Sequence, residues 1–301
     1  MGNVLVLGAE GFIGSCLVSE LVKNYKVVGY DRLPVSNKKG LENYHYISGN
    51  FAEEQNFSSI LRDNDISAIY HLISTTTPKV GTSQIEQEVE SNVLPTIRLL
   101  DAAAECGAEQ IIFSSSGGTV YGDNPETHSE NEPIAPICSY GTQKMVIEGY
   151  LKLYSHIHNL KVRIARIGNP YGSLMRKGQT QGIIPIFLQK LHSNEGITVY
   201  GNTKRDYIHI SDVIKALVLL LQYKGSEQVF NIASGKGTYI NDLIRMLEDI
   251  SGKKFTSIQY EDIRSCDVLE NVLDISLAKK ELNWEPKISL REGIKKTIDL
   301  I

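Results

Sequence analysis

The sequence predicts an α/β fold with a doubly wound parallel sheet of the Rossmann type and a smaller C-terminal α/β region. Two observations predict this class. A strand, a glycine-rich turn, a helix and a second strand follow one another within residues 3–31. Apolar strand-like runs then alternate with helical patterns as far as residue 168, and such alternation indicates a parallel sheet covered on both faces. We therefore expect two intertwined regions, 1–168 and 169–301.

The N-terminal segment carries the most specific local pattern. Residues 3–7 are apolar and rich in β-branched side chains, as in a strand that is buried on both faces. A glycine-rich turn follows, then a helical pattern over residues 12–23 and a second apolar run, 27–30, that ends in Asp31. This succession is the βαβ unit that binds dinucleotides.

The glycines of this turn have separate physical roles. Gly8 permits a tight turn, Gly11 lets the backbone approach a pyrophosphate, and Gly14 lets the helix pack closely against the strand. Asp31 can accept both hydrogen bonds of an adenosine ribose, and its charge repels the 2′-phosphate of NADP. The pattern therefore predicts NAD as the cofactor. Because Arg32 is a residue type that accommodates that phosphate, NADP stays open as an alternative.

Further elements follow from hydrophobic periodicity. We expect strands at residues 44–48, 68–73, 110–114 and 162–167. We expect helices at residues 53–62, 83–104, 140–155, 182–191, 212–222, 240–250 and 290–298. Ligands of open α/β sheets bind at the carboxyl ends of the strands, so the second region is expected to lie over that edge.

Composition and charge exclude several classes of function. The 301 residues carry a net charge of −4 without a basic cluster, so neither a nucleic-acid binder nor an anionic-membrane binder is expected. Four scattered cysteines without a CxxC pair predict a cytoplasmic protein without disulfides or a metal site. No apolar run approaches the roughly 18 residues that a membrane span needs, and the N-terminus lacks a signal-peptide pattern.

Candidate catalytic residues are concentrated between residues 114 and 144. The buried run that ends near Ser114 continues into two more serines, and a serine hydroxyl at a strand end can hold a substrate oxygen. Tyr140 and Lys144 share one face of a predicted helix because they are four residues apart. A lysine ammonium and a nicotinamide cation both favour a phenolate, which turns a tyrosine of pKa about 10 into a usable general base.

These motifs identify a family. The chain resembles the extended short-chain dehydrogenases/reductases from end to end, and within them the sugar-nucleotide 4-epimerases similar to UDP-glucose 4-epimerase. The resemblance rests on the glycine-rich turn and on several further segments, namely His71–Ser74, Ser114–Gly122, Tyr140–Lys144, Gly168–Gly172, Arg205–His209, Arg264–Val268 and Leu282–Trp284.

The resemblance implies a role for each matching position. Tyr140 is the catalytic base, Lys144 holds the nicotinamide ribose and tunes Tyr140, and Ser116 binds the sugar hydroxyl. Asn50 stands where the family usually has an Asp that faces the adenine amino group. Region 1–168 would bind NAD and region 169–301 mainly the nucleotide sugar. The expected cofactor residues are Gly8, Gly11, Phe12, Ile13, Gly14, Asp31, Asn50, Phe51, Leu72, Ser74, Tyr140 and Lys144. The expected substrate residues are Ser116, Tyr140, Asn169, Arg205, Arg264 and Asn271, with the two arginines on the diphosphate.

The sequence departs from the family pattern at several positions. Gly117 and Gly118 lengthen the segment before Tyr121 by one residue, so Ser115 remains an alternative to Ser116 as the catalytic hydroxyl. Gly168 stands where relatives often carry a bulky aromatic residue. In the family a large Tyr at the position of Asn271 closes the sugar pocket against N-acetyl groups. A smaller Asn271 therefore predicts that N-acetylhexosamine nucleotides fit as well as plain hexoses.

The expected activity is 4-epimerisation of a UDP-hexose or UDP-N-acetylhexosamine through a transient 4-keto sugar, with NAD tightly bound and recycled. A dehydratase or a decarboxylase of this family would need an acidic residue after the catalytic hydroxyl, where this chain has Gly117-Gly118-Thr119. Two alternatives stay open: an NAD(P)H-dependent 4-ketosugar-nucleotide reductase, which needs the same residues, and a non-catalytic NAD(H)-binding regulator. The resemblance also implies a homodimer formed through helices 83–104 and 140–155.

Overall fold

The computed structural model describes residues 2–76, 84–172 and 182–300. The chain divides into two compact units, and each is discontinuous in sequence. The first unit comprises residues 1–115, 139–165 and 214–230, and the second comprises residues 116–138, 166–213 and 231–301. The predicted division at residue 168 is a different one, because it separates the residues expected to bind the cofactor from those expected to bind the substrate. It stays a prediction.

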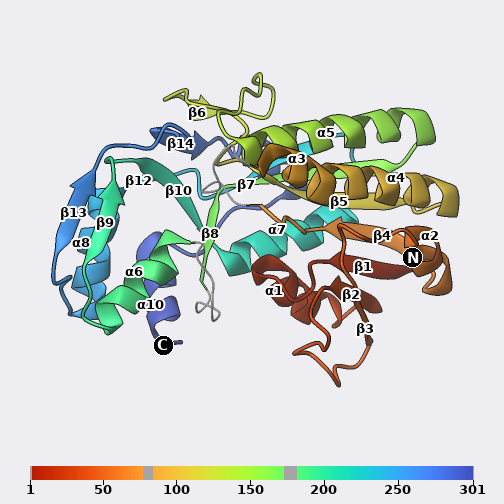
Figure 1. Ribbon diagram of the computed structural model, residues 1–301, viewed down its shortest axis with the longest axis horizontal. Coiled ribbons are helices and arrows are strands. Elements are labelled where there is room, and N and C mark those ends of the chain that lie inside the picture. Colours follow the sequence, from red (N-terminus) through yellow and green to blue (C-terminus); the bar gives the residue numbers. More distant parts are fainter. Residues whose placement is uncertain (1, 77–83, 173–181, 301) are drawn as a thin grey trace. The chain divides into compact units, whose positions relative to one another are not determined.

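The first unit is built on the predicted parallel sheet (Figure 1). Seven strands of the described residues pair in the order β11-β7-β5-β4-β1-β2-β3, and β1 to β5 pair in parallel. The strands are β1 (Asn3–Leu7), β2 (Val27–Asp31), β3 (Tyr44–Ser48), β4 (Ile66–His71), β5 (Gln110–Ser116), β7 (Lys161–Ile167) and β11 (Val229–Ile232). The strand order reverses between β1 and β4, and such a switch point is where ligands of this fold bind.

Helices cover both faces of this sheet (Figure 1). They are α1 (Phe12–Leu21), α2 (Phe57–Asp63), α3 (Ile85–Glu88), α4 (Leu94–Cys106), α5 (Ser139–His158) and α7 (Ile210–Gln222). Helix α4 packs against α2 and α5, while α7 accepts hydrogen bonds from Tyr70 and Gln110 of the sheet through its backbone carbonyls. A π-helical segment, Val89–Val93, joins α3 to α4, so the predicted helix 83–104 is one helical stretch with a local irregularity.

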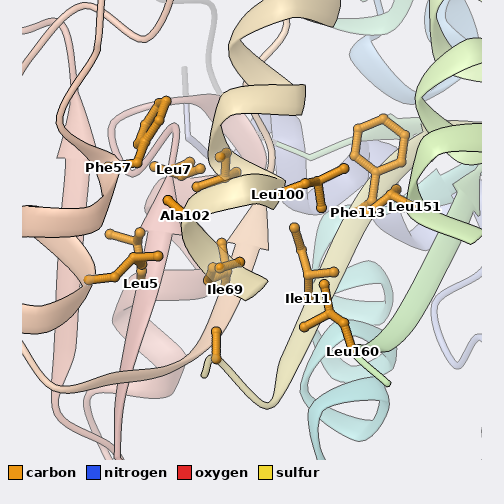
Figure 2. Close-up of a cluster of buried hydrophobic side chains, with 14 of the residues drawn as sticks. Leu5, Leu7, Phe57, Ile69, Leu100, Ala102, Ile111, Phe113, Leu151 and Leu160 are labelled. Carbon is orange, nitrogen blue, oxygen red and sulfur yellow. The ribbon is translucent and has the colours of Figure 1, made fainter. Parts of the chain in front are cut away.

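A hydrophobic core lies between the sheet and the helices α4 and α5 (Figure 2). Leu5, Leu7, Ile69 and Ile111 of the strands are fully buried against side chains of these helices, such as Leu100. Each buried aliphatic side chain of this size contributes about 1.5–3 kcal/mol of transfer free energy. The core therefore fixes the carboxyl ends of β1, β4 and β5, where the predicted site residues begin.

The largest error in a predicted helix boundary lies at the start of α2. Periodicity placed a helix at 53–62, but α2 begins at Phe57. The Glu54 carboxylate accepts hydrogen bonds from the backbone N–H of Asn56 and from the Tyr30 hydroxyl, and the Glu53 N–H donates to the Asn50 carbonyl. These bonds stabilise a turn before the helix. In addition, Ser83 of the predicted helix 83–104 lies outside the described residues.

The second unit contains shorter strands and its own helices. A mixed sheet has the order β12-β10-β14-β6 with β8 also paired to β10, and β9 pairs separately with β13. The strands are β6 (Thr127–His128), β8 (Asn169–Tyr171), β9 (Ile197–Tyr200), β10 (Lys204–His209), β12 (Gly237–Tyr239), β13 (Ile258–Glu261) and β14 (Glu270–Leu273). The helices are α6 (Ile183–His192), α8 (Ile240–Ser251), α9 (Ser276–Leu282) and α10 (Leu290–Ile298).

A buried carboxylate joins three segments of this unit. Asp206 of β10 is fully buried and accepts hydrogen bonds from the backbone N–H groups of Ser234, Gly235 and Leu273. Burial raises the pKa of Asp206, although these hydrogen bonds oppose that effect. The arrangement fixes β10 and β14, the strands that carry Arg205 and Asn271.

Candidate active site

The glycine-rich turn after β1 has the shape that a dinucleotide requires. Gly8 has φ +85°, a conformation that favours glycine. A Cβ added to Gly14 would lie 2.0 Å from the Gly8 carbonyl oxygen, so only glycine allows α1 to approach the turn this closely. The N-cap of α1 is Gly11, which has no side chain of its own to form a cap, and the backbone of Phe12 and Ile13 forms the first turn. A helix start of this kind fits a pyrophosphate.

The carboxylate of Asp31 is held in place at the end of β2. One oxygen accepts a hydrogen bond from the Glu10 N–H at 2.9 Å, and the other accepts from the Arg32 N–H at 2.8 Å. Each carboxylate oxygen can accept a second hydrogen bond. The geometry therefore fits the predicted contact of Asp31 with an adenosine ribose.

The other predicted cofactor residues follow β3 and β4. The Asn50 side-chain oxygen accepts from the Ala52 N–H at 3.3 Å, in the turn after β3. The Phe51 side chain is buried against Phe57 and His71, which leaves only its backbone to face a cofactor.

The segment after β4 lies beside β1. The Leu72 N–H donates to the Leu7 carbonyl at 3.1 Å, and the Ser74 hydroxyl donates to the Thr76 carbonyl at 3.1 Å. The loops after β1 to β4 thus leave one edge of the sheet, on both sides of its switch point. This arrangement fits a bound dinucleotide.

Helix α5 carries the predicted catalytic pair. Tyr140, in its first turn, is half-buried, whereas Lys144 is 4% exposed. The Lys144 ammonium donates to the Ser114 carbonyl at 2.9 Å and lies 5.6 Å from the centroid of the Tyr140 ring. The bond to β5 fixes the ammonium beside the ring, so the predicted pairing of Tyr140 with Lys144 has the expected geometry.

Lys144 titrates in an unusual range. Burial lowers the pKa of its ammonium from 10.5 to about 8, while the charge of Glu148 acts in the opposite direction. Glu148 lies four residues further along α5, is 1% exposed and accepts a hydrogen bond from the Ser115 hydroxyl at 2.6 Å. Glu148 is not among the site residues predicted from the sequence. Its signal is the i, i+4 spacing that continues the face of Tyr140 and Lys144.

We expect the turnover number to fall at alkaline pH with an apparent pKa near 8. Lys144 is protonated below this pH and supports a Tyr140 phenolate, and it is neutral above it. The pH–rate profile at saturating substrate measures this limb. Glu148→Gln is expected to move the limb to lower pH, because it removes the charge that opposes deprotonation. Lys152→Met, at an exposed position of α5, is the control and leaves the limb in place. A rate that stays constant up to pH 10 contradicts the assignment.

A second buried acid holds the start of α5. The Glu88 carboxylate accepts a hydrogen bond from the Ser139 hydroxyl and one from the Gln143 side-chain amide at 2.5 Å. Glu88 is 4% exposed, and its two donors lie on either side of Tyr140 in the sequence. These contacts orient the first turn of α5. Sequence alone gave no sign of them, because a Glu in an acidic helical stretch usually faces water.

Ser116 ends β5 and belongs to the second unit. Its carbonyl accepts the N–H groups of Thr119 and Val120, which forms a tight turn. A Cβ added to Gly118 would lie 3.7 Å from the Asn169 side-chain nitrogen and 3.9 Å from the Ser116 hydroxyl. The turn therefore brings together the predicted Ser116 and Asn169, and Gly118 leaves space beside both.

Asn271 supports this turn from β14. Its side-chain nitrogen donates to the Gly117 carbonyl at 2.9 Å, and the residue is 1% exposed. A Cβ on Gly117 would lie 2.4 Å from a terminal methyl of Leu273 and 3.1 Å from the Arg166 carbonyl oxygen, so any other residue would require the Leu273 side chain to move. Asn271 is thus a direct neighbour of the turn that begins at Ser116.

The two predicted arginines lie close enough to interact. Burial lowers the pKa of Arg205, and the charge of Arg264 adds to this effect. The Arg205 guanidinium donates to the Lys204 and Leu269 carbonyls. Burial also opposes the charge on Arg264, but the hydrogen bond and the charge of Asp267, at 2.6 Å, outweigh it and raise the pKa. Asp267 therefore stabilises the cationic form of Arg264, whereas burial disfavours that of Arg205.

Arg264 faces an open cavity of about 720 Å³ in the second unit. The lining residues are Tyr200, Tyr260, Glu261, Asp262, Ile263 and Arg264. The Arg264 guanidinium carbon lies over the Tyr200 ring, 4.9 Å from its centroid, and this contact orients the group against an aromatic surface. The cavity thus has an aromatic wall and one oriented guanidinium, but Glu261 and Asp262 also line it, and the contact of Arg264 with a diphosphate stays a prediction.

The structure also bears on the choice between Ser115 and Ser116, on metal binding and on membrane-spanning helices. The Ser115 hydroxyl is buried and bonded to Glu148, so Ser116 is the better candidate for contact with substrate. Within residues 2–76, 84–172 and 182–300, no three His, Cys, Asp or Glu side chains are placed to hold a metal ion. Among the helices of those same residues, none has the length and apolar character to cross a membrane.

Comparison with known proteins places the chain in a family. A model described as the NAD-dependent epimerase/dehydratase family matches residues 4–233. A dTDP-4-dehydro-6-deoxyglucose reductase of Escherichia coli is 35% identical over 99% of this chain and 97% of its own length. A putative UDP-glucose 4-epimerase of Methanocaldococcus jannaschii is 32% identical over 98% and 97%. The crystal structure of UDP-glucose 4-epimerase from Thermotoga maritima with UDP-glucose superposes with a TM-score of 0.91 at 31% identity, covering 99% and 98% of the two chains.

Proposed function

We propose that this chain, which belongs to the NAD-dependent epimerase/dehydratase family, is a sugar-nucleotide 4-epimerase. It is an NAD-dependent enzyme. The observation that carries the proposal is the buried Lys144 ammonium, fixed to the Ser114 carbonyl beside the Tyr140 ring, on the unit that contains the dinucleotide turn. This pair is suited to remove and return a proton at one hydroxyl.

The residues of the first unit account for the proton chemistry. Tyr140 takes the proton of the sugar 4-hydroxyl, and Lys144 stabilises the phenolate form that can do so. NAD, when bound, would supply the hydride acceptor and donor for C4 of the sugar. Asp31 and the start of α1 hold the cofactor. Because the phenol of Tyr140 gives the proton back when the 4-keto sugar is reduced on its other face, the enzyme is returned to its starting state.

The residues of the second unit account for substrate binding. Arg205 and Arg264 bind the diphosphate, and Ser116 and Asn169 contact the sugar. Asn271, beside the Gly117 turn, is smaller than a Tyr, and on this ground we propose that an N-acetyl group fits. We propose UDP-hexoses and UDP-N-acetylhexosamines as substrates. This substrate range is tested by measuring the rates on UDP-galactose and UDP-N-acetylgalactosamine under the same conditions. Complete rejection of the acetylated sugar contradicts it.

A 4-ketosugar-nucleotide reductase is the second candidate. It is favoured by the Escherichia coli relative, whose name states reduction of a dTDP-4-dehydro-6-deoxy sugar. The same Ser116, Tyr140 and Lys144 would serve it, with NAD(P)H as a released cosubstrate. No observation favours a non-catalytic regulator.

The assay that distinguishes the two activities uses substrate deuterated at C4. The purified protein is incubated with UDP-glucose or UDP-N-acetylglucosamine without added reductant, and products are read by mass spectrometry and NMR. The 4-epimer with its deuterium retained supports the epimerase. Absence of the 4-epimer, together with turnover of a 4-keto sugar nucleotide only when NADH or NADPH is consumed, supports the reductase.

We also propose a cytoplasmic homodimer. Helices α4 and α5 contact each other, and Leu94, Leu153 and Ile157 on them are exposed. Exposed apolar side chains on two helices that contact each other suit a symmetric helical interface. Analytical ultracentrifugation of the purified protein measures its oligomeric state.

We expect Arg264→Ala to raise the KM for the nucleotide sugar by about tenfold to a hundredfold, with kcat changed less than about threefold. A hydrogen bond to a charged group contributes roughly 1.5–3 kcal/mol, and about 1.4 kcal/mol is tenfold in affinity. Steady-state kinetics on the substrate found above provide the measurement. Arg245→Ala, at an exposed position of α8, is the control. An unchanged KM contradicts the assignment of Arg264 to the diphosphate.

A further inference from the structure

Glu10 is a buried acid inside the glycine-rich turn. The residue is 2% exposed, and its carboxylate accepts hydrogen bonds from the Ser36 hydroxyl at 2.5 Å and from the Asn37 side-chain amide at 2.9 Å. The Asn37 N–H also donates to it, at 3.3 Å. The Glu10 N–H in turn donates to Asp31. One residue therefore links the phosphate-binding turn to the end of β2 and to the segment that follows.

These bonds fasten the segment between β2 and β3. Ser36, itself buried, accepts the Lys38 N–H at 2.9 Å, and the Tyr46 hydroxyl donates to the Leu33 carbonyl at 2.6 Å. Arg32, the cation that could meet an added phosphate, is exposed at the start of this segment. Glu10 thus holds in place the stretch of chain that borders the ribose position of Asp31.

Glu10 and Asp31 act on the same surroundings. Burial raises the pKa of Tyr46 to about 12, and the charges of Asp31 and Glu10 add to the effect. Burial likewise raises the pKa of Tyr44, again with contributions from Glu10 and Asp31. Two carboxylates that both influence the same pair of tyrosines produce a concentrated negative field at the end of β2.

We infer that Glu10 is a specificity-determining residue that excludes dinucleotides with a 2′-phosphate. Its charge adds to that of Asp31 and repels the phosphate dianion. Its bonds to Ser36 and Asn37 keep the segment that carries Arg32 from rearranging around such a group. The inference depends on the dinucleotide site alone and holds for an epimerase and for a reductase.

A competition for the cofactor site tests the inference without measuring activity. The protein is equilibrated with equimolar NAD and NADP and rapidly desalted, and the bound dinucleotides are quantified by chromatography. In Glu10→Gln and Glu10→Ala we expect the NADP:NAD occupancy ratio to rise at least about tenfold over the unsubstituted protein, because a carboxylate that would repel the 2′-phosphate is removed. The melting temperature with each dinucleotide provides a second readout.

Matched variants separate this role from a general loss of binding. Glu42→Gln removes an exposed carboxylate from the segment between the same strands and is expected to leave the ratio unchanged. Ser36→Ala removes one hydrogen bond but keeps the charge, and a rise of less than about threefold is expected. A higher ratio in either Glu10 variant supports the inference. A ratio within twofold of the unsubstituted protein in both variants, or a loss of NAD binding without a change in ratio, overturns it.

Discussion

Replacing Tyr140 with Phe is expected to lower kcat by about 10³-fold and to leave the bound NAD in place. The change removes a single oxygen from a side chain at the start of α5 and keeps its ring. Proton transfer by a positioned side chain contributes roughly 10²–10⁴-fold, and the hydroxyl of Tyr140 is the group that we place at the substrate 4-oxygen. Lys144, 5.6 Å from the ring centroid, would then have no phenolate to stabilise.

The measurement is kcat at saturating nucleotide sugar, together with the NAD content of the purified variant. Tyr150→Phe, a half-buried tyrosine of the same helix, is the matched control and is expected to retain full activity. If Tyr140→Phe keeps more than about a tenth of the activity, another group moves the proton and the assignment of the base is wrong. A variant that has lost its NAD reports instead on folding of the site, and the retained NAD therefore has to be shown first.

The dinucleotide unit could be predicted closely because its signals are local. The strand at residues 3–7 was predicted with the bounds that β1 has, since a short apolar run after the N-terminus and a glycine turn leave few alternatives. In the second unit, local signals had the same effect at one helix: α10, Leu290–Ile298, was also predicted with its observed bounds, and its start is marked by Ser289 and Glu292. Such motifs require only neighbouring residues, and a single sequence shows them fully.

The second unit was less predictable because its strands are short and pair over long distances in the sequence. Strand β6 has two residues, Thr127 and His128, and pairs with β14 at Val272 and Leu273. Two residues give no periodicity to detect, and the strand exists only because the partner is there. Helix α9, Ser276–Leu282, was missed for a similar reason, since seven residues hold barely two helical turns.

The burial of two acidic residues near the site was also not predicted from the sequence. The residue types and spacing identified Tyr140 and Lys144, but Glu10 and Glu148 are carboxylates that sequence alone would assign to the surface. Their function depends on partners far along the chain, such as Ser36 for Glu10 and Ser115 for Glu148. Only the folded structure brings these groups together, and they set the electrostatics around residues that the sequence could identify.

Replacing Gly14 with Ala is expected to remove NAD binding and to destabilise the first unit by about 3 kcal/mol, the upper part of the range for overpacking. The new Cβ would lie 2.0 Å from the Gly8 carbonyl oxygen, 2.8 Å from the Gly8 carbonyl carbon and 3.1 Å from the Ala9 Cα. All three are backbone atoms, and the Gly8 oxygen is also held by the Gly11 N–H at 2.9 Å. Relief therefore requires α1 to move away from the turn, which separates the helix start from the phosphate position.

The NAD content of the purified variant and its thermal unfolding measure the two effects. We expect less than about a tenth of the normal occupancy and a melting temperature lower by roughly 5–10 °C. Gly149→Ala is the matched control, because Gly149 also lies in a helix but an added Cβ there meets nothing within 4 Å. It is expected to stabilise the protein by up to about 1 kcal/mol, since Ala favours helix more than Gly. If Gly→Ala lowers the stability at position 14 and raises it at position 149, the loss at position 14 is due to the close approach of α1 to Gly8. Normal NAD occupancy in Gly14→Ala would show instead that the turn can open without losing the cofactor.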